Sequence, residues 1–214
     1  MPDGVKFPLT LAVIAAIAGG GLAFVQVGTA ERIAENRKRK LNAAFREIPG
    51  YQSNVPVPAP DGREKEIAAK YGDAKCFRLL GEGGKFIGYA AQVACTDPSC
   101  YNSTDPIVLV VAVDAGVEKV LVVRTTKNSE TPGLGTRTSQ QKPPRALIGE
   151  QPKPEDPQYP FLDMFAGRST DRLDAYEKGS KDFDAISGAT ISSNAVLGGV
   201  RKAVALIREL TAAR

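Results

Sequence analysis

An uncharged stretch from Phe7 to Val27 constrains this chain more than any other feature, because it is mostly apolar over about 20 residues. A helix of that length, at about 1.5 Å per residue, crosses a hydrocarbon core about 30 Å thick. The sequence therefore predicts a transmembrane anchor within residues 1–30. The alternative is a signal peptide cleaved after residues 28–30, Gly-Thr-Ala, but the segment before the stretch has one basic side chain, Lys6.

A basic cluster follows the predicted anchor. It consists of five side chains: Arg32, Arg37, Lys38, Arg39 and Lys40. The positive-inside rule would place this cluster, and the domain after it, in the cytoplasm. The simpler interpretation is a solvated helix face, since an apolar stripe at helical spacing runs through the same segment: Ile33, Leu41, Phe45 and Ile48. This stripe predicts an amphipathic juxtamembrane helix over residues 31–50.

Residues 51–214 show the pattern of one α+β domain. Segments 86–93, 107–113 and 117–123 are strand-like, and the last two flank a turn-like Asp-Ala-Gly. They predict a twisted, largely antiparallel sheet flanked by helices. Segment 107–113 is apolar on both faces, so we expect a central strand that is covered on both sides. Residues 141–160 carry six prolines and predict an extended connection, either a loop that faces a partner or a plain linker.

The cysteine, histidine and charge content argues against several kinds of site. A net charge of +4 gives no reason to predict nucleic acid binding. Three cysteines without histidine and without Cys-x-x-Cys spacing are a poor ligand set, so we predict no metal site. Cys95 and Cys100 flank a turn-like segment, and outside the cytoplasm this spacing favours a disulfide. Cys76 is an alternative partner for either, so the connectivity stays open.

Segment 184–190, Asp-Ala-Ile-Ser-Gly-Ala-Thr, is the strongest candidate for a functional site. A threonine hydroxyl is a poor nucleophile unless a base or metal activates it, and the chain has no histidine. Thr190 is therefore better suited to modification by a separate enzyme than to catalysis. Ser192, Ser193 or Asn194 can cap a following helix, whose free N–H groups suit a phosphate. This helix is expected from an apolar face: Val196, Val200, Val204 and Ile207. The alternative is a turn and helix cap without a ligand.

Residues 130–135, Glu-Thr-Pro-Gly-Leu-Gly, form a second motif. Pro132 followed by Gly133 is a turn signature, so a tight turn without a ligand is the default interpretation.

Together the two motifs resemble those of a known family of flavin carriers. Proteins with the signature Asp-x-x-Ser-Gly-Ala-Thr receive flavin mononucleotide (FMN) through a phosphoester bond to the threonine. The loop motif resembles that of the G subunit of the Rnf electron-transport complex and, in related form, of the C subunit of the sodium-pumping NADH:quinone oxidoreductase. The resemblance includes the membrane anchor and residues 161–165, where we expect a short helical segment. The short chain favours the Rnf family.

This sequence departs from the family pattern at two places. Residues 100–103 are Cys-Tyr-Asn-Ser where the family often has Gly-Tyr-Gly-Gly, and residues 128–129 are Asn-Ser where a histidine or lysine often precedes Glu130. These departures concern the outer contacts of the flavin rather than the attachment threonine.

The resemblance implies a specific site and cofactor. FMN would be linked covalently to Thr190 by a flavin transferase, which splits flavin adenine dinucleotide and recognises Asp184. The residues implied around the phosphate are Ser187, Gly188, Ala189, Ser192 and Ser193. Those implied near the flavin ring are Glu130, Thr131, Gly133 and Leu134. No catalytic residue and no metal ligand are expected.

The function implied is that of an electron relay in an ion-translocating membrane complex, with no complete catalytic site of its own. Its partners would be other membrane subunits and the lipid bilayer, and the domain would lie on the extracytoplasmic side of the inner membrane. One alternative is a component like the C subunit of the sodium-pumping enzyme. Others are a cofactor-free anchored adaptor and a self-contained enzyme whose flavin is reduced by a soluble substrate.

Overall fold

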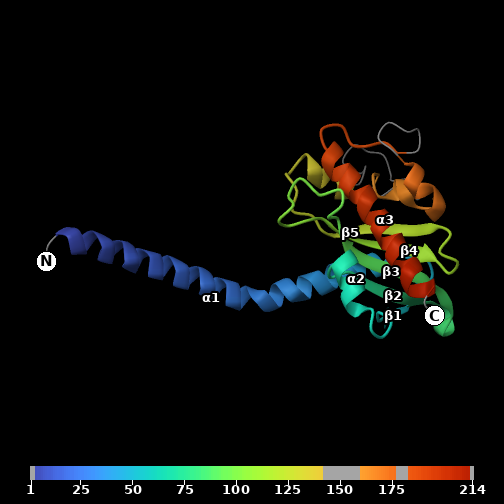
Figure 1. Cartoon of the computed structure of the whole chain (residues 1–214), viewed down its shortest axis with the longest axis horizontal. Coiled ribbons are helices and arrows are strands. Elements are labelled where there is room, and N and C mark those ends of the chain that lie inside the picture. The colour runs from blue at the N-terminus through green and yellow to red at the C-terminus, as the bar shows by residue number, and fades with distance from the viewer. Residues whose placement is uncertain (1–2, 142–159, 177–182, 213–214) are drawn as a thin grey trace, which may run out of the picture. The chain divides into compact units, whose positions relative to one another are not determined.

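The computed structural model describes residues 3–141, 160–176 and 183–212 (Figure 1). The chain divides into two units, Met1–Lys40 and Leu41–Arg214, which are described separately. The first unit consists of helix α1 (Asp3–Arg46), which continues into the second. From Thr10 onward α1 includes an 18-residue window with a mean hydropathy of 2.0, and none of this window is buried.

Large apolar side chains are exposed along this part of α1: Leu11, Val13, Ile14, Ile17, Leu22, Phe24, Val25 and Val27. Such exposure is unfavourable in water and favourable in a hydrocarbon core. The helix therefore has the properties of the predicted membrane anchor. It continues past residue 30 without a break in its secondary structure. The division of the chain at residues 30 and 50 remains a prediction.

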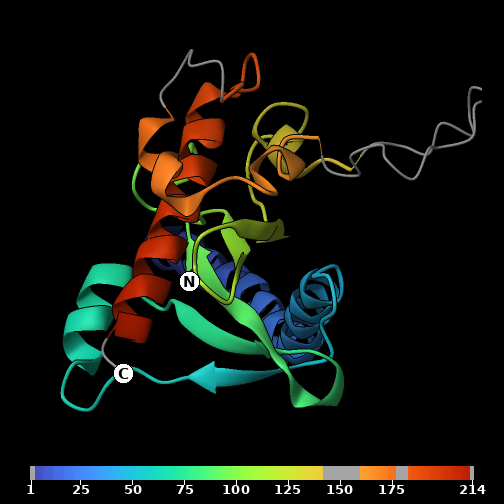
Figure 2. The same ribbon diagram turned by 90° about the vertical axis from the view of Figure 1, so that its right-hand side faces the viewer.

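The second unit is built on a five-stranded sheet (Figure 2). Its strands are β1 (Ser53–Val57), β2 (Lys75–Leu80), β3 (Phe86–Ala94), β4 (Val108–Asp114) and β5 (Val120–Lys127), and the short helix η1 (Glu82–Gly84) joins β2 to β3. Each strand pairs in antiparallel fashion with the next along the chain. The predicted α+β fold with a largely antiparallel sheet is confirmed.

The strand boundaries agree with the sequence prediction except at one hairpin. β3 and β4 match segments 86–93 and 107–113 to within one residue at each end. The predicted start of β5 at residue 117 is wrong, because Val117 lies in the turn with a φ of 58°. This turn is closed by the Asp114 side chain, which accepts the N–H groups of Glu118 and Lys119 at 2.7 and 3.0 Å.

β4 is covered on both faces, as its apolar sequence predicts. Leu109, Val111 and Val113 belong to the cluster packed against α3 (Thr190–Ala212), whereas Val110 and Ala112 belong to the cluster on the opposite face. The alternation follows from the period of two along a strand. A continuous apolar run therefore supplies both cores of the domain.

The end of α1 covers the second face of the sheet. Ala44, Phe45 and Ile48 are buried there, with Leu41 packed beside them. The Phe45 ring meets the ring of Phe77 on β2 edge to face, with 5.3 Å between centroids. The C-terminal part of the predicted amphipathic stripe thus becomes part of the core.

The first face is covered by α3, whose predicted apolar residues are all buried: Val196, Val200, Val204 and Ile207. Three 3-10 helices complete this layer: η2 (Gly135–Ser139), η4 (Asp163–Phe165) and η5 (Thr170–Ala175). The short helical segment predicted at 161–165 corresponds to η4. Most of the predicted proline-rich connection, residues 142–159, lies outside the described residues.

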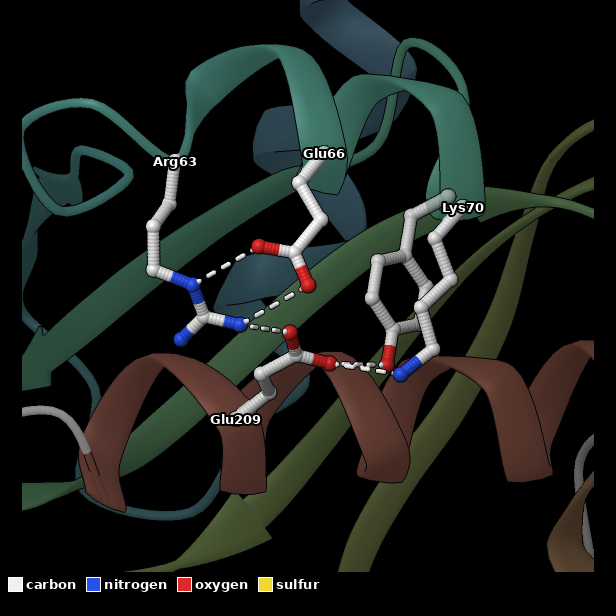
Figure 3. Close-up of polar contacts among 5 residues, drawn as sticks. Arg63, Glu66, Lys70 and Glu209 are labelled. Atoms are coloured by element: carbon white, nitrogen blue, oxygen red, sulfur yellow. Dashed lines mark hydrogen bonds and ion pairs between the residues drawn. The ribbon is translucent and has the colours of Figure 1, made fainter.

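Helix α2 (Glu64–Tyr71) is fastened to the C-terminal part of α3 by a polar network. The Glu209 carboxylate accepts hydrogen bonds from Lys70 and Tyr71, both at 2.8 Å, and from Arg63 at 2.6 Å. Figure 3 shows Arg63 also paired with Glu66. The hydrogen bond from Lys70 is the main reason that the pKa of Glu209 lies below its usual value. The network holds α2 against the helix that begins at Thr190.

Candidate functional site

Thr190 is the first residue of α3, so the helix begins earlier than the predicted capping residues 192–194. The turn before it depends on Gly188, whose φ of +79° is a left-handed conformation that other residues rarely adopt. Ala189 donates its N–H to the Ile186 carbonyl at 2.9 Å and closes the turn. Thr190 is half-buried, and among the described residues its hydroxyl has no hydrogen-bond partner. That hydroxyl is available for modification.

Two serines in the first turn of α3 are engaged inside the protein. Ser193 is fully buried, and its hydroxyl oxygen accepts the N–H of Ile186 at 3.1 Å. Ser192 is also buried, and its hydroxyl donates a hydrogen bond to the Glu130 carboxylate. Both hydroxyls therefore fasten the start of α3 to neighbouring segments.

Glu130 connects three segments of the domain. One carboxylate oxygen accepts the Ser192 hydroxyl, and the other accepts the N–H of Asn102 at 2.8 Å. The Glu130 N–H donates to the Asn128 side chain at 3.0 Å. The Glu130 side chain is 4% exposed, and a buried carboxylate is costly unless donors surround it. We refer to Asn102, Glu130 and Ser192 as the Glu130 cluster.

The two sequence motifs meet at the start of α3. A Cβ atom added to Gly135 would lie 2.6 Å from the Ser192 hydroxyl oxygen and 2.6 Å from the Glu130 Cβ, so this position has room only for glycine. The Leu134 side chain lies 3.7 Å from where a Cβ on Gly188 would be. The loop at 130–135 thus packs directly against the segment that carries Thr190.

The loop itself is a tight turn, as Pro132 and Gly133 predict. Gly133 has a φ of +77°, and the Leu134 N–H donates to the Thr131 carbonyl at 3.2 Å. Thr131 and Gly133 are exposed, and the Leu134 side chain is 49% exposed. These three residues can therefore contact a ligand above the start of α3.

A cleft of about 730 Å³ adjoins this site. It is lined by residues from η2, from the segment around η4 and from the start of the attachment motif: Arg137, Gln140, Gln141, Pro160, Phe161, Met164, Asp184, Ala185, Ile186 and Ser187. Arg137 donates to the Ser187 carbonyl at 3.2 Å and so joins two sides of the cleft. Phe161 packs edge to face against Phe165 and Phe183, with centroid separations of 6.0 and 6.1 Å. The cleft therefore has a firm apolar wall beside charged groups.

The structure separates the residues singled out in the sequence into three groups. Asp184 and Ser187 line the cleft, the hydroxyls of Ser192 and Ser193 are bound within the domain, and Thr190 lies between them. Sequence reasoning missed Arg137 and Gln140, because a cation and an amide in and beside a 3-10 helix follow no recognisable pattern. It also missed the bond from Asn102 to Glu130, which joins residues 28 positions apart.

A long apolar helix followed by this domain defines a membrane-anchored protein with an FMN-binding domain. Residues 103–205 match the model of the FMN-binding domain, and residues 5–48 match that of the RnfG N-terminal region. The chain belongs to the RnfG family, the G subunits of ion-translocating oxidoreductase complexes. The member from Pseudomonas aeruginosa, which carries the name of that complex, is 30% identical over 92% of this chain and 85% of its own length.

Two further comparisons agree with this family. The G subunit of the Na(+)-translocating ferredoxin:NAD(+) oxidoreductase complex of Acetobacterium woodii is 27% identical over 96% of this chain and 92% of its own. The crystal structure of Shewanella oneidensis NqrC is 19% identical and superposes with a TM-score of 0.43, covering 76% of this chain and 72% of that one. A structural likeness at that level carries no argument about function.

Proposed function

We propose that this chain is the covalent flavoprotein subunit of an Rnf-type ion-translocating complex, and that it relays electrons through FMN esterified to Thr190. The observation that carries the proposal is the unengaged Thr190 hydroxyl at the start of α3, beside a cleft and next to the loop at 130–135. When bound, FMN supplies one-electron and two-electron redox chemistry through its isoalloxazine ring. A link through the phosphate leaves that ring chemically unmodified.

The residues around Thr190 fit FMN. A volume of about 730 Å³ lies within the range of ligand pockets, about 300–1,000 Å³. Phe161, Met164 and Ile186 offer apolar surface to a flat ring, while Arg137 and Asp184 offer charge to its polar groups. The first turn of a helix presents backbone N–H groups and a positive dipole end, which favour a phosphate next to Thr190.

A separate flavin transferase would attach the flavin, because this chain offers no base for the reaction. It contains no histidine, and both oxygens of Glu130 already accept hydrogen bonds. In the transfer, the Thr190 oxygen forms a bond to the FMN phosphorus of flavin adenine dinucleotide, and the bond from that phosphorus to adenosine monophosphate breaks. The hydroxyl proton passes to a base of the transferase. Asp184 is exposed, where the transferase can recognise it.

The chain's own residues hold and position the cofactor rather than catalyse a reaction. The Glu130 cluster fixes the start of α3, and Gly188 and Leu134 shape the surface beside Thr190. Electrons would enter and leave through other membrane subunits. The match to the RnfG N-terminal region favours the Rnf family over the C subunit of the sodium-pumping enzyme, and the match to an FMN-binding domain argues against a cofactor-free adaptor.

The domain is proposed to lie on the extracytoplasmic side of the inner membrane, although the basic cluster at residues 32–40 favours the opposite side by charge alone. Long domains are translocated largely regardless of flanking charge, and the cluster can pair with anionic lipid. We expect a protease added to spheroplasts to digest the domain without detergent. Digestion that occurs only after detergent lysis would place the domain in the cytoplasm.

The role of the transferase is tested by the intact mass of the full chain. After expression with a flavin transferase, we expect the mass of the chain plus one FMN less one water. Without the transferase, we expect the mass of the bare chain, because the domain lacks a base of its own. A flavinylated chain in the absence of any transferase would show that attachment is autocatalytic.

A further inference from the structure

Cys95 and Cys100 lie at the two ends of a four-residue turn, directly after β3. Both side chains are buried, with exposed fractions of 0% and 3%. The Cys100 thiol donates to the Cys95 carbonyl at 3.2 Å, and the Cys100 sulfur accepts the N–H of Ile107 at 3.3 Å. A bridge between Thr96 and Ser99 closes the turn. The backbone thus holds the two cysteines close together.

The two thiols interact with each other as well as with the backbone. A hydrogen bond from the Cys95 thiol to the Cys100 sulfur lowers the pKa of Cys100 and raises that of Cys95. Because the thiolate is the reactive form, Cys100 is the better nucleophile and Cys95 keeps its proton. This asymmetry is the arrangement of an attacking and a resolving cysteine.

The third cysteine is too far from Cys95 to compete. Cys76 on β2 pairs with Ala91 on β3, four residues before Cys95. Four residues of strand span about 13 Å, whereas a disulfide requires Cα atoms within about 7 Å. The connectivity that the sequence leaves open therefore resolves in favour of Cys95 and Cys100.

We propose that Cys95 and Cys100 form an intramolecular disulfide by exchange with an oxidised thiol carrier, a molecule that itself contains a disulfide. The Cys100 sulfur bonds to one sulfur of the carrier, whose other sulfur leaves as a thiol. The Cys95 sulfur then bonds to Cys100 and displaces the second carrier thiol. Two protein thiols are oxidised, one carrier disulfide is reduced, and both protons pass to the carrier. Because both cysteines are buried, exchange takes place as the domain folds or opens locally.

The disulfide would stabilise a segment that supports the candidate site. The turn packs against α3, where a Cβ on Gly199 would lie 2.5 Å from the Cys95 sulfur and where Lys202 donates to Thr96 at 3.0 Å. Asn102, two residues after Cys100, supplies the backbone donor of the Glu130 cluster. A bond between the cysteines would therefore fix the chain on which that donor depends. This inference does not depend on flavin attachment.

The test counts free thiols in the full chain, purified in detergent and held in oxidised glutathione with a low concentration of urea that permits local opening. The protein is then denatured with a maleimide, and its mass is measured. We expect one alkylated cysteine before reduction and three after it. The Cys76→Ser variant should show none before reduction and two after it, whereas Cys100→Ser should show two in both states.

Two results would overturn the inference. One is the alkylation of all three cysteines in the oxidised sample. The other is a Cys76→Ser variant in which both remaining thiols react before reduction, which would mean that Cys76 takes part in the bond.

Discussion

Thr190→Ala is expected to abolish covalent flavin in the full chain, even when a flavin transferase is present. A phosphoester needs the side-chain oxygen that alanine lacks. Ser192 and Ser193 offer no substitute, because both hydroxyls are buried and bound to protein groups. The substitution should leave folding nearly unchanged, within about 0.5 kcal/mol, because the Thr190 side chain is half-buried and its hydroxyl makes no hydrogen bond to the described residues.

The measurement is the flavin fluorescence of the denatured band together with the intact mass. Thr190→Ser keeps an oxygen at the same position and should retain part of the signal. Ser187→Ala is the matched control, since Ser187 is an exposed hydroxyl three residues earlier in the same motif. We expect it to carry flavin as the unmodified chain does. A flavin signal that survives in Thr190→Ala but disappears in Ser187→Ala would move the attachment point.

Gly135→Ala is expected to destabilise the domain by about 1–3 kcal/mol and to reduce flavin incorporation several-fold. Its Cβ would lie 2.6 Å from the Ser192 hydroxyl oxygen and 2.7 Å from a Glu130 carboxylate oxygen, inside normal contact distance. Relief requires the loop at 130–135 to move away from α3, which separates Glu130 from Ser192 and leaves a buried carboxylate short of a donor.

The urea midpoint of the detergent-solubilised chain measures the change in stability, and in-gel fluorescence measures incorporation. Gly116→Ala is the control, because its Cβ would approach only the flexible Glu118 side chain, at 3.4 Å. If both variants unfold at the same urea concentration and carry equal flavin, the close packing of Gly135 on the Glu130 cluster does not support the site.

The features of the fold that sequence reasoning predicts well are those that depend on local periodicity. The anchor follows from a long apolar run, β4 from β-branched residues on both faces, and α3 from four apolar residues at helical spacing. β1 carries Pro56 and has no apolar alternation, so its place at the edge of the sheet could not be read from its own residues. The 3-10 helices likewise depend on packing against α3 and β5 rather than on a sequence period.

The candidate site divides in a similar way. The positions of Thr190 and of the turn at Gly133 follow from local motifs, whereas the Glu130 cluster depends on contacts between segments distant in sequence. Asn102 and Asn128 both lie where this chain departs from the family pattern. Asn128 accepts the Glu130 N–H and donates to Ser139 at 2.8 Å. Residues that looked like losses in the motif thus make their own bonds to the loop.

The central claim is best tested by the fragment spectrum of the tryptic peptide that spans residues 182–201, taken from the full chain after expression with a flavin transferase. The account predicts that one FMN less one water is carried by this peptide, and that the fragment ions assign the added mass to Thr190. An unmodified peptide from a yellow protein whose flavin is released on denaturation would contradict the account. So would an added mass on Ser187 or Ser192.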